Sequence, residues 1–125
     1  MSFFSSNRSS LKNHEQLDFA VSQVPYLLFR IERSFKQQMM MLKAKNGKVR
    51  EVQLRLICEY GEEEQLIKVA PYSSESSDEQ IFKLLEHQIS YIDLSNPIRE
   101  FELVILPERW SLPVDEFLDF QLSLA

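Results

Sequence analysis

The residues that could carry out chemistry are few and lie far apart in the sequence. His14 and His87 have no cysteine or second histidine at the spacing of a metal site, so we predict no metal ligands. The acids at 62–64 fall in a predicted turn and Asp115 and Glu116 fall in the tail, where solvated charge is the ordinary explanation. Only two glycines occur, which argues against a glycine-rich phosphate loop. The sequence therefore predicts no catalytic residues and no cofactor, and we expect no enzymatic activity from this chain on its own.

Four basic residues are the strongest candidates for a binding role. They fall within eight residues with no acid between them: Lys43, Lys45, Lys48 and Arg50. The net charge is −5, yet residues 1–50 carry nine Lys/Arg against three Asp/Glu, and residues 51–125 carry five against sixteen. Each cation can displace a counterion from a phosphate backbone, so a polyanion would meet the first half of the chain. The alternative is a solvated loop between two elements, and the acidic total argues against strong, indiscriminate nucleic-acid binding.

The first element that must position these cations is a helix. Apolar residues recur every three or four positions from Leu17 to Leu42, which is typical of an amphipathic helix. Pro25 lies within this stripe, and proline suits the first turn of a helix but disrupts its interior. We therefore expect the main helix from about Pro25 to Leu42, with a kinked or separate turn before it.

Strands and a second helix follow. The expected elements are a strand over 52–58, a returning strand over 65–70, a helix over 81–92 and a strand over 101–105. The strands over 52–58 and 101–105 alternate apolar and polar residues, which indicates one buried face, and the polar turn at 61–64 makes 65–70 the second strand of a hairpin. Ser77 and Gln80 have the spacing of a capping box at the start of the second helix. We expect Cys58 to be a small core residue, because nothing in its surroundings would lower the pKa of its thiol.

The order helix, strand, strand, helix, strand predicts an α+β fold. We expect a two-layer sandwich in which two helices cover one face of a small, largely antiparallel sheet. Residues 1–16 would form an N-terminal arm or a frayed first strand, residues 17–106 the domain, and residues 107–125 a C-terminal tail. The single cysteine and the absence of an export signal in MSFFSSNRSS favour a cytoplasmic protein, and no apolar run is long enough for a membrane span.

In their order and spacing, these segments resemble the little-finger domain of Y-family translesion DNA polymerases over about residues 17–106. The matching segments are PYLLF at 25–29, REVQLRLICEY at 50–60, VAP at 69–71, SSESSDEQ at 73–80 and REFELVIL at 99–106. The resemblance implies a domain that lays its sheet against duplex DNA, with its first strand within residues 1–10. The chain has no room for the rest of a polymerase, so it would be a C-terminal piece of a longer protein or a free-standing relative. Its low basic charge is closer to the catalytically inactive, ImuB-like homologues that act as adaptors.

The same resemblance implies which residues would contact the DNA backbone. They are the four clustered cations named above, together with Arg55 and Lys68 on the sheet. Glu100 and Glu102 are predicted on the same sheet, and two acids that face phosphates would weaken binding.

The last five residues supply a separate indication. Gln121, Leu122, Ser123, Leu124 and Ala125 are similar to the bacterial sliding-clamp-binding pentapeptide, whose usual form is Gln-Leu-Ser/Asp-Leu-Phe. In such a short peptide, glutamine would fix orientation through hydrogen bonds and the leucines would fill an apolar pocket. Ala125 stands where an aromatic residue normally ends the motif, which would weaken binding. The alternative is a disordered tail or one that packs on the domain.

Two functions remain open from the sequence. The first is a DNA-damage-tolerance module in DNA repair, translesion synthesis and the SOS response, which contacts duplex DNA weakly and is tethered to the sliding clamp. Its further partners would be other polymerase or mutasome subunits, and none would be a membrane. The second is a protein–protein interaction adaptor that does not bind DNA, which the acidic second half and the aromatic residues Trp110, Phe117 and Phe120 favour.

Overall fold

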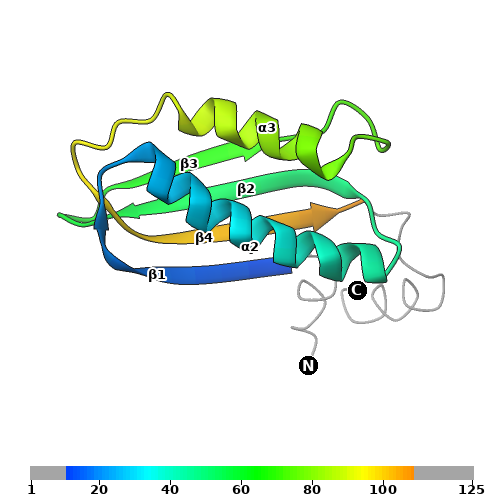
Figure 1. Cartoon of the computed structure of the whole chain (residues 1–125), viewed down its shortest axis with the longest axis horizontal. Helices are drawn as coiled ribbons and strands as arrows, with labels where there is room; N and C mark the ends of the chain where they lie inside the picture. Colours follow the sequence, from blue (N-terminus) through cyan, green and yellow to red (C-terminus); the bar gives the residue numbers. More distant parts are fainter. Residues whose placement is uncertain (1–10, 109–125) are drawn as a thin grey trace, which may run out of the picture.

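The computed structural model describes residues 11–108, which form one four-stranded sheet and two helices (Figure 1). The elements in chain order are β1 (Leu11–Val21), α2 (Val24–Ala44), β2 (Val49–Cys58), β3 (Glu64–Val69), α3 (Asp78–Ile89) and β4 (Ile98–Pro107). The strands lie in the order β1-β4-β2-β3 and every neighbouring pair is antiparallel. Both helices cover the same face of the sheet, so the predicted α+β sandwich is confirmed.

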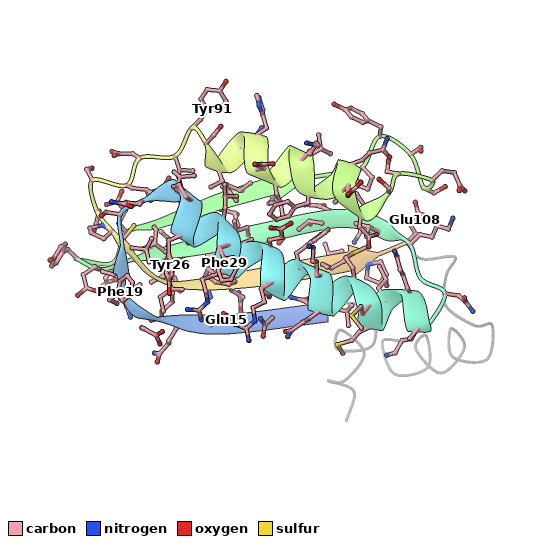
Figure 2. The ribbon with its side chains drawn as sticks, in the orientation of Figure 1. Glu15, Phe19, Tyr26, Phe29, Tyr91 and Glu108 are labelled. Carbon is pink, nitrogen blue, oxygen red and sulfur yellow. The ribbon has the colours of Figure 1, made fainter. Side chains whose placement is uncertain are left out.

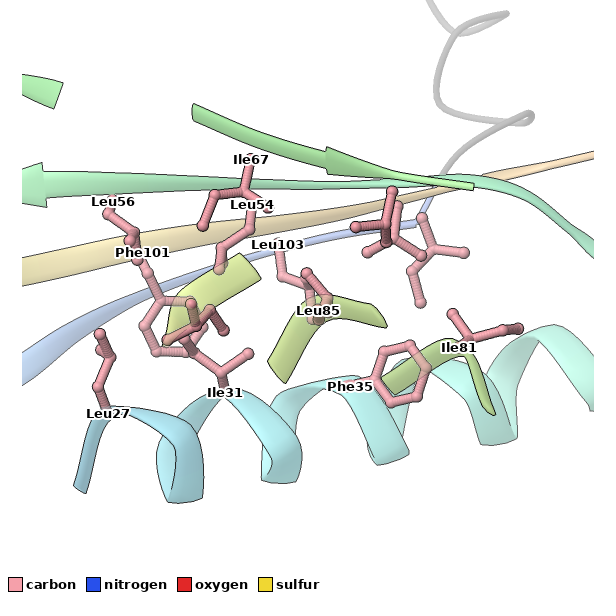
Figure 3. Close-up of a cluster of buried hydrophobic side chains, with 14 of the residues drawn as sticks. Leu27, Ile31, Phe35, Leu54, Leu56, Ile67, Ile81, Leu85, Phe101 and Leu103 are labelled. Atoms are coloured by element: carbon pink, nitrogen blue, oxygen red, sulfur yellow. The ribbon is translucent and has the colours of Figure 1, made fainter. Parts of the chain in front are cut away.

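The core lies between this covered face and the two helices (Figure 3). Alternate residues of β2 and β4 point into it, among them Leu54, Leu56, Phe101 and Leu103, all fully buried. The buried apolar residues of α2 and α3 form one stripe on each helix, as expected for a period of 3.6 residues, and these stripes pack against the covered face of the sheet. Cys58 is part of this core, as predicted.

Both helices begin as the sequence indicates. Pro25 lies in the first turn of α2, where its missing N–H costs nothing. The backbone N–H of Gln80 donates to Ser77 Oγ at 3.2 Å, and the N–H of Ser77 donates to Gln80 Oε1 at 2.8 Å. This reciprocal pair is the predicted capping box, and it fixes the first residue of α3.

The prediction for residues 17–21 was wrong. This segment ends β1 and pairs with β4, whereas its apolar spacing suggested the start of the first helix. The sequence concealed the strand because two of its inward positions are polar: Asn13 donates to Ser34 Oγ at 2.6 Å, and Glu15 accepts from Arg30 at 3.1 Å (Figure 2 labels Glu15). Side chains on α2 satisfy these groups, so the strand can bury them without the usual cost.

The first strand therefore lies at 11–21 and not within residues 1–10, which are outside the described part of the chain. It also crosses the boundary expected at residues 16 and 17. β2 begins three residues earlier than expected, at Val49, and this change moves Arg50 from a loop onto a strand.

Candidate nucleic-acid interface

The C-terminus of α2 holds three of the predicted DNA-contacting cations in a defined turn. Lys43 lies in the last turn of the helix, Lys45 is its C-cap and Lys48 follows. The N–H of Gly47 donates to Leu42 O at 2.9 Å, and the N–H of Asn46 donates to Lys43 O at 2.9 Å. With Asn46 in the left-handed region at φ 57°, this is a Schellman motif, so the turn is locally specified.

Gly47 also ties the turn to the core. A Cβ at this position would lie 2.4 Å from Cδ1 of Leu42, a buried core residue. The backbone can approach the leucine only because the side chain is absent. The three lysines are therefore held at one end of the domain rather than on a loose loop.

The acidic β3–α3 loop meets this turn at the same end. Lys43 Nζ lies 2.8 Å from Asp78 Oδ2, and Lys48 Nζ lies 3.2 Å from Glu75 Oε2. Between the two segments is a pocket of about 400 Å³, whose wall includes Asn46 and serine residues of the loop. We call this region, residues 43–50 and 71–78, the loop end. No local pattern predicts these ion pairs, because about thirty residues separate the partners.

The face of the sheet that no helix covers is the open face. The register aligns its side chains in rows across the strands: Lys12, Val104, Gln53 and Lys68 in one row, His14, Glu102, Arg55 and Leu66 in the next, and Gln16, Glu100, Ile57 and Glu64 in the third. Arg55, Lys68 and both predicted acids thus lie together on this face, as the sequence indicated.

Most charges on the open face are already paired. Arg55 contacts Glu64 at 3.1 Å and Glu102 at 3.2 Å, and Lys12 lies 3.8 Å from Glu102. Glu100 accepts a contact from His14 at 2.6 Å and another from Arg99. Partial burial opposes the charge of Arg55, but the attraction of Glu102 and the bond to Glu64 outweigh it, so its pKa is raised.

Three of the predicted cations have no ion pair among the described residues: Lys45, Arg50 and Lys68. Arg50 lies where the β2–β4 register shifts, at the start of β2. Lys68 is the second-last residue of β3, so it lies toward the loop end. Five of the six predicted residues therefore gather at or near the loop end, and Arg55 lies apart from them in the middle of the open face.

The opposite end of the sheet, which we call the hairpin end, is acidic. The β2–β3 turn exposes Glu59, Glu62 and Glu63, and Glu64 begins β3. Asp93 lies nearby, since Gln65 Nε2 donates to its backbone oxygen at 3.0 Å. A polyanion would meet repulsion here, so the hairpin end is a poor candidate for contact with DNA.

β4 returns the chain to the loop end. The N–H of Glu108 donates to Lys48 O at 2.8 Å, and Figure 2 shows Glu108 at that end. The predicted clamp-binding residues 121–125 lie outside the described part of the chain.

Two further observations concern residues 11–108 only. No group of three His, Cys, Asp or Glu side chains is arranged to hold a metal ion. Neither helix combines the length and apolar character that a membrane span needs.

Comparison with known proteins identifies the fold. No protein-family model matches the chain, and no curated protein matches its sequence. Among solved structures, a Y-family DNA polymerase chimera superposes with a TM-score of 0.66 at 14% identity, over 79% of this chain and 28% of that one. DinB from Sulfolobus solfataricus gives 0.63 at 12% identity, over 78% and 28%. The chain thus spans less than a third of the length of these polymerases.

A third match is a separate domain. The little finger domain of PolIV, solved in complex with the beta-clamp processivity factor, superposes with a TM-score of 0.60 at 7% identity, over 78% of this chain and 86% of that domain. The predicted likeness to the little-finger domain of Y-family polymerases is therefore confirmed at the level of the fold.

Proposed function

We propose that this chain is a non-catalytic module of DNA-damage tolerance that contacts the backbone of duplex DNA. The observation that carries the proposal is the match to an isolated little finger domain over most of that domain's length. Its work would be positioning, because the fold places a set of cations at one end of a four-stranded sheet. Its low basic charge is the feature it would share with the inactive, ImuB-like homologues.

The loop end is the part of the domain best suited to meet phosphates. It collects Lys43, Lys45, Lys48 and Arg50, and Lys68 lies on the adjacent row of the open face. The Schellman turn and the contact of Gly47 with Leu42 keep these cations in place before DNA arrives. A preformed set loses less conformational entropy on binding.

The tail would supply a second attachment. Residues 121–125 resemble a clamp-binding peptide, and the little finger domain of PolIV has been solved with a clamp. The tail begins beside the loop end, at Glu108. A weak DNA contact and a clamp tether on one chain raise the effective concentration of each site for its partner.

A salt titration tests the DNA contact. Binding of the full chain to a short fluorescent duplex should weaken as salt rises from about 50 to 200 mM, with a shallow slope because few phosphates are contacted. Reversing the charge of Lys43, Lys45 and Lys48 together should abolish binding. The matched control reverses the charges of Arg33, Lys36 and Lys83, which are exposed on the outer sides of the helices. This control chain should bind the duplex more tightly than the chain with the three reversed lysines. Absence of binding by the wild-type chain at low salt would contradict the proposed DNA contact.

A second experiment tests the tether. The Leu122→Ala/Leu124→Ala chain should lose binding to a purified bacterial sliding clamp, whereas Ala125→Phe, which restores the usual aromatic residue, should bind more tightly. Equal binding by all three chains would remove the clamp from the proposal.

The alternative is an adaptor that binds a protein and no DNA. The paired charges of the open face favour it, because Arg55 and Lys12 already have carboxylate partners. Recruitment of a partner that survives the triple lysine reversal, by a chain that binds no duplex, would select this function.

A further inference from the structure

The pocket at the loop end has the composition of an anion site that the protein fills with its own carboxylates. Two ammonium groups, Lys43 and Lys48, reach it from one side, and the acids of the β3–α3 loop approach from the other. Serine hydroxyls and the amide of Asn46 also line the wall, and apolar side chains form the rest of it. Ammonium groups and neutral hydrogen-bond donors are also what a phosphate group needs.

The carboxylate of Glu75 is held weakly, because its side chain is 82% exposed. An ion pair so exposed contributes little to stability, so exchanging this carboxylate for another anion costs little. Asp78, in the first turn of α3, is half-buried at 35% exposed, yet it is still more accessible than the acids of the open face. Neither Glu75 nor Asp78 contributes a buried side chain to the core, and both segments can stay in place during the exchange.

The open face does not offer the same exchange. Glu102 is 17% exposed and Glu100 is 12% exposed, and each contacts two basic groups fixed by the strand register. A cation on the open face could be freed only if a mostly buried glutamate side chain of β4 moved away from its partners. A phosphate would therefore displace the acids of the loop end before those of the open face.

We propose that Glu75 and Asp78 occupy the position of a DNA phosphate and that duplex DNA binds by exchanging its backbone phosphate for them. The proposal rests on the DNA contact proposed above and adds a mechanism for its weakness. In the unbound protein the two acids neutralise Lys43 and Lys48. In the complex the lysines contact phosphate, and the carboxylates turn to solvent and continue to repel the backbone.

Removing the two acids should therefore strengthen DNA binding. The Glu75→Gln/Asp78→Asn chain should bind a short duplex at least about fivefold more tightly at low salt, as expected for removing repulsion of about 1 kcal/mol from the site. The matched control is Glu59→Gln/Glu62→Gln, which changes the net charge equally at the hairpin end and should tighten binding much less. Circular dichroism would establish that all the chains are folded.

Amide chemical shifts locate the exchange independently. Duplex DNA should shift the amides of residues 46–48 and 73–77 in the wild-type chain. Inorganic phosphate at matched ionic strength should shift them less. Equal shifts with inorganic phosphate would identify free phosphate as the ligand and overturn the DNA assignment.

The outcomes separate this inference from the proposed function. The wild-type chain, the acid-free chain (Glu75→Gln/Asp78→Asn) and the control chain could all bind the duplex with equal affinity, with no amide shifts at the loop end. That result would overturn the exchange and leave the DNA contact intact. Equal tightening in both variants would attribute the effect to net charge and also overturn it. Binding by the acid-free chain alone would show that the acids block DNA and do not exchange with it, and would overturn both proposals, as would no binding by any chain.

Discussion

The two ends of the sheet treat their charges differently. At the loop end, Lys43 at the end of α2 pairs with Asp78 at the start of α3, and Lys48 pairs with Glu75 of the β3–α3 loop. At the hairpin end, Glu59 and Glu62 lie in one tight turn, and no ion pair joins them to a cation among residues 11–108. A net charge of −5 therefore describes neither end.

The preference for a partner therefore depends on where charges are paired, and not on the net charge alone. The loop end carries four cations and two acids, and the acids pair with Lys43 and Lys48, so its affinity for a polyanion can be changed by moving two side chains. At the hairpin end Arg99 is paired with Glu100, while Glu59 and Glu62 have no ion pair among the described residues, so the end as a whole repels a polyanion. Strands β2 and β4 run between the two ends, so the same core positions both.

The largest expected effect comes from breaking this shared core. Leu103→Ala removes a fully buried side chain from the centre of β4 and should lower the free energy of unfolding by about 3 kcal/mol. Its neighbour Val104 points to the open face, so Val104→Ala should cost less than about 1 kcal/mol. Urea unfolding measures both. If spectroscopic probes at the two ends lost structure at different urea concentrations, the two ends would not share one core.

The two glycines allow the ends to be compared directly. Gly47→Ala places a Cβ against Leu42 and should cost about 2 kcal/mol through overpacking. Gly61, in the hairpin turn at φ 74°, has open space around it, so Gly61→Ala should cost about 1 kcal/mol through backbone strain alone.

Asparagine distinguishes the two causes, because it tolerates the left-handed region. Gly61→Asn should recover most of the stability that Gly61→Ala loses, whereas Gly47→Asn should be no better than Gly47→Ala. Thermal unfolding of the four chains measures this. Equal recovery at both positions would show that sterics at Leu42 do not fix the loop end.

Local patterns were enough to predict most of the fold. The 3.6-residue period located α2 and α3, alternation located β2 and β4, the polar turn after β2 located β3, and the capping box located the first residue of α3. These signals act within a few residues. β1 was expected only as one alternative for residues 1–16, because Asn13 and Glu15 occupy inward positions, and only contact with Ser34 and Arg30 on α2 makes them compatible with burial.

The candidate site was predicted in part for the same reason. The clustered cations are adjacent in the sequence, so composition alone found them. Only tertiary packing brings their partners to the turn: Glu75 lies on the β3–α3 loop and Asp78 in the first turn of α3. The pairing of Arg55 with Glu102 likewise depends on the strand register, which no local pattern specifies.

Ion pairs on the open face should contribute more to stability than those at the loop end. Glu102→Gln removes a carboxylate that is mostly shielded from water and that pairs with Lys12 and Arg55. Arg55 keeps its second partner, Glu64, and the free energy of unfolding should fall by about 1 kcal/mol. Glu75→Gln removes an exposed partner of Lys48 and should cost no more than about 0.3 kcal/mol. Urea unfolding at low and high salt measures the difference. Equal costs would contradict the view that only the loop-end pairs exchange readily.

The smallest expected effect concerns Cys58, at the hairpin end. Burial raises the pKa of its thiol, and the negative charge of Glu63 raises it further. Because the pKa is higher in the folded chain than in the unfolded chain, the thiol contributes no destabilisation below about pH 8.5, and stability falls as the pH rises through the folded value. The wild-type chain should therefore lose more stability between neutral and alkaline pH than Cys58→Ala does.

Glu63→Gln tests the contribution of the acidic turn to this loss. Since burial is the larger cause, the substitution should reduce the alkaline loss only slightly, and Glu75→Gln at the loop end should not change it. Urea unfolding at a series of pH values measures the four chains. A decline that disappeared in Glu63→Gln would show that the charge of the hairpin end, and not the core that both ends share, controls this thiol.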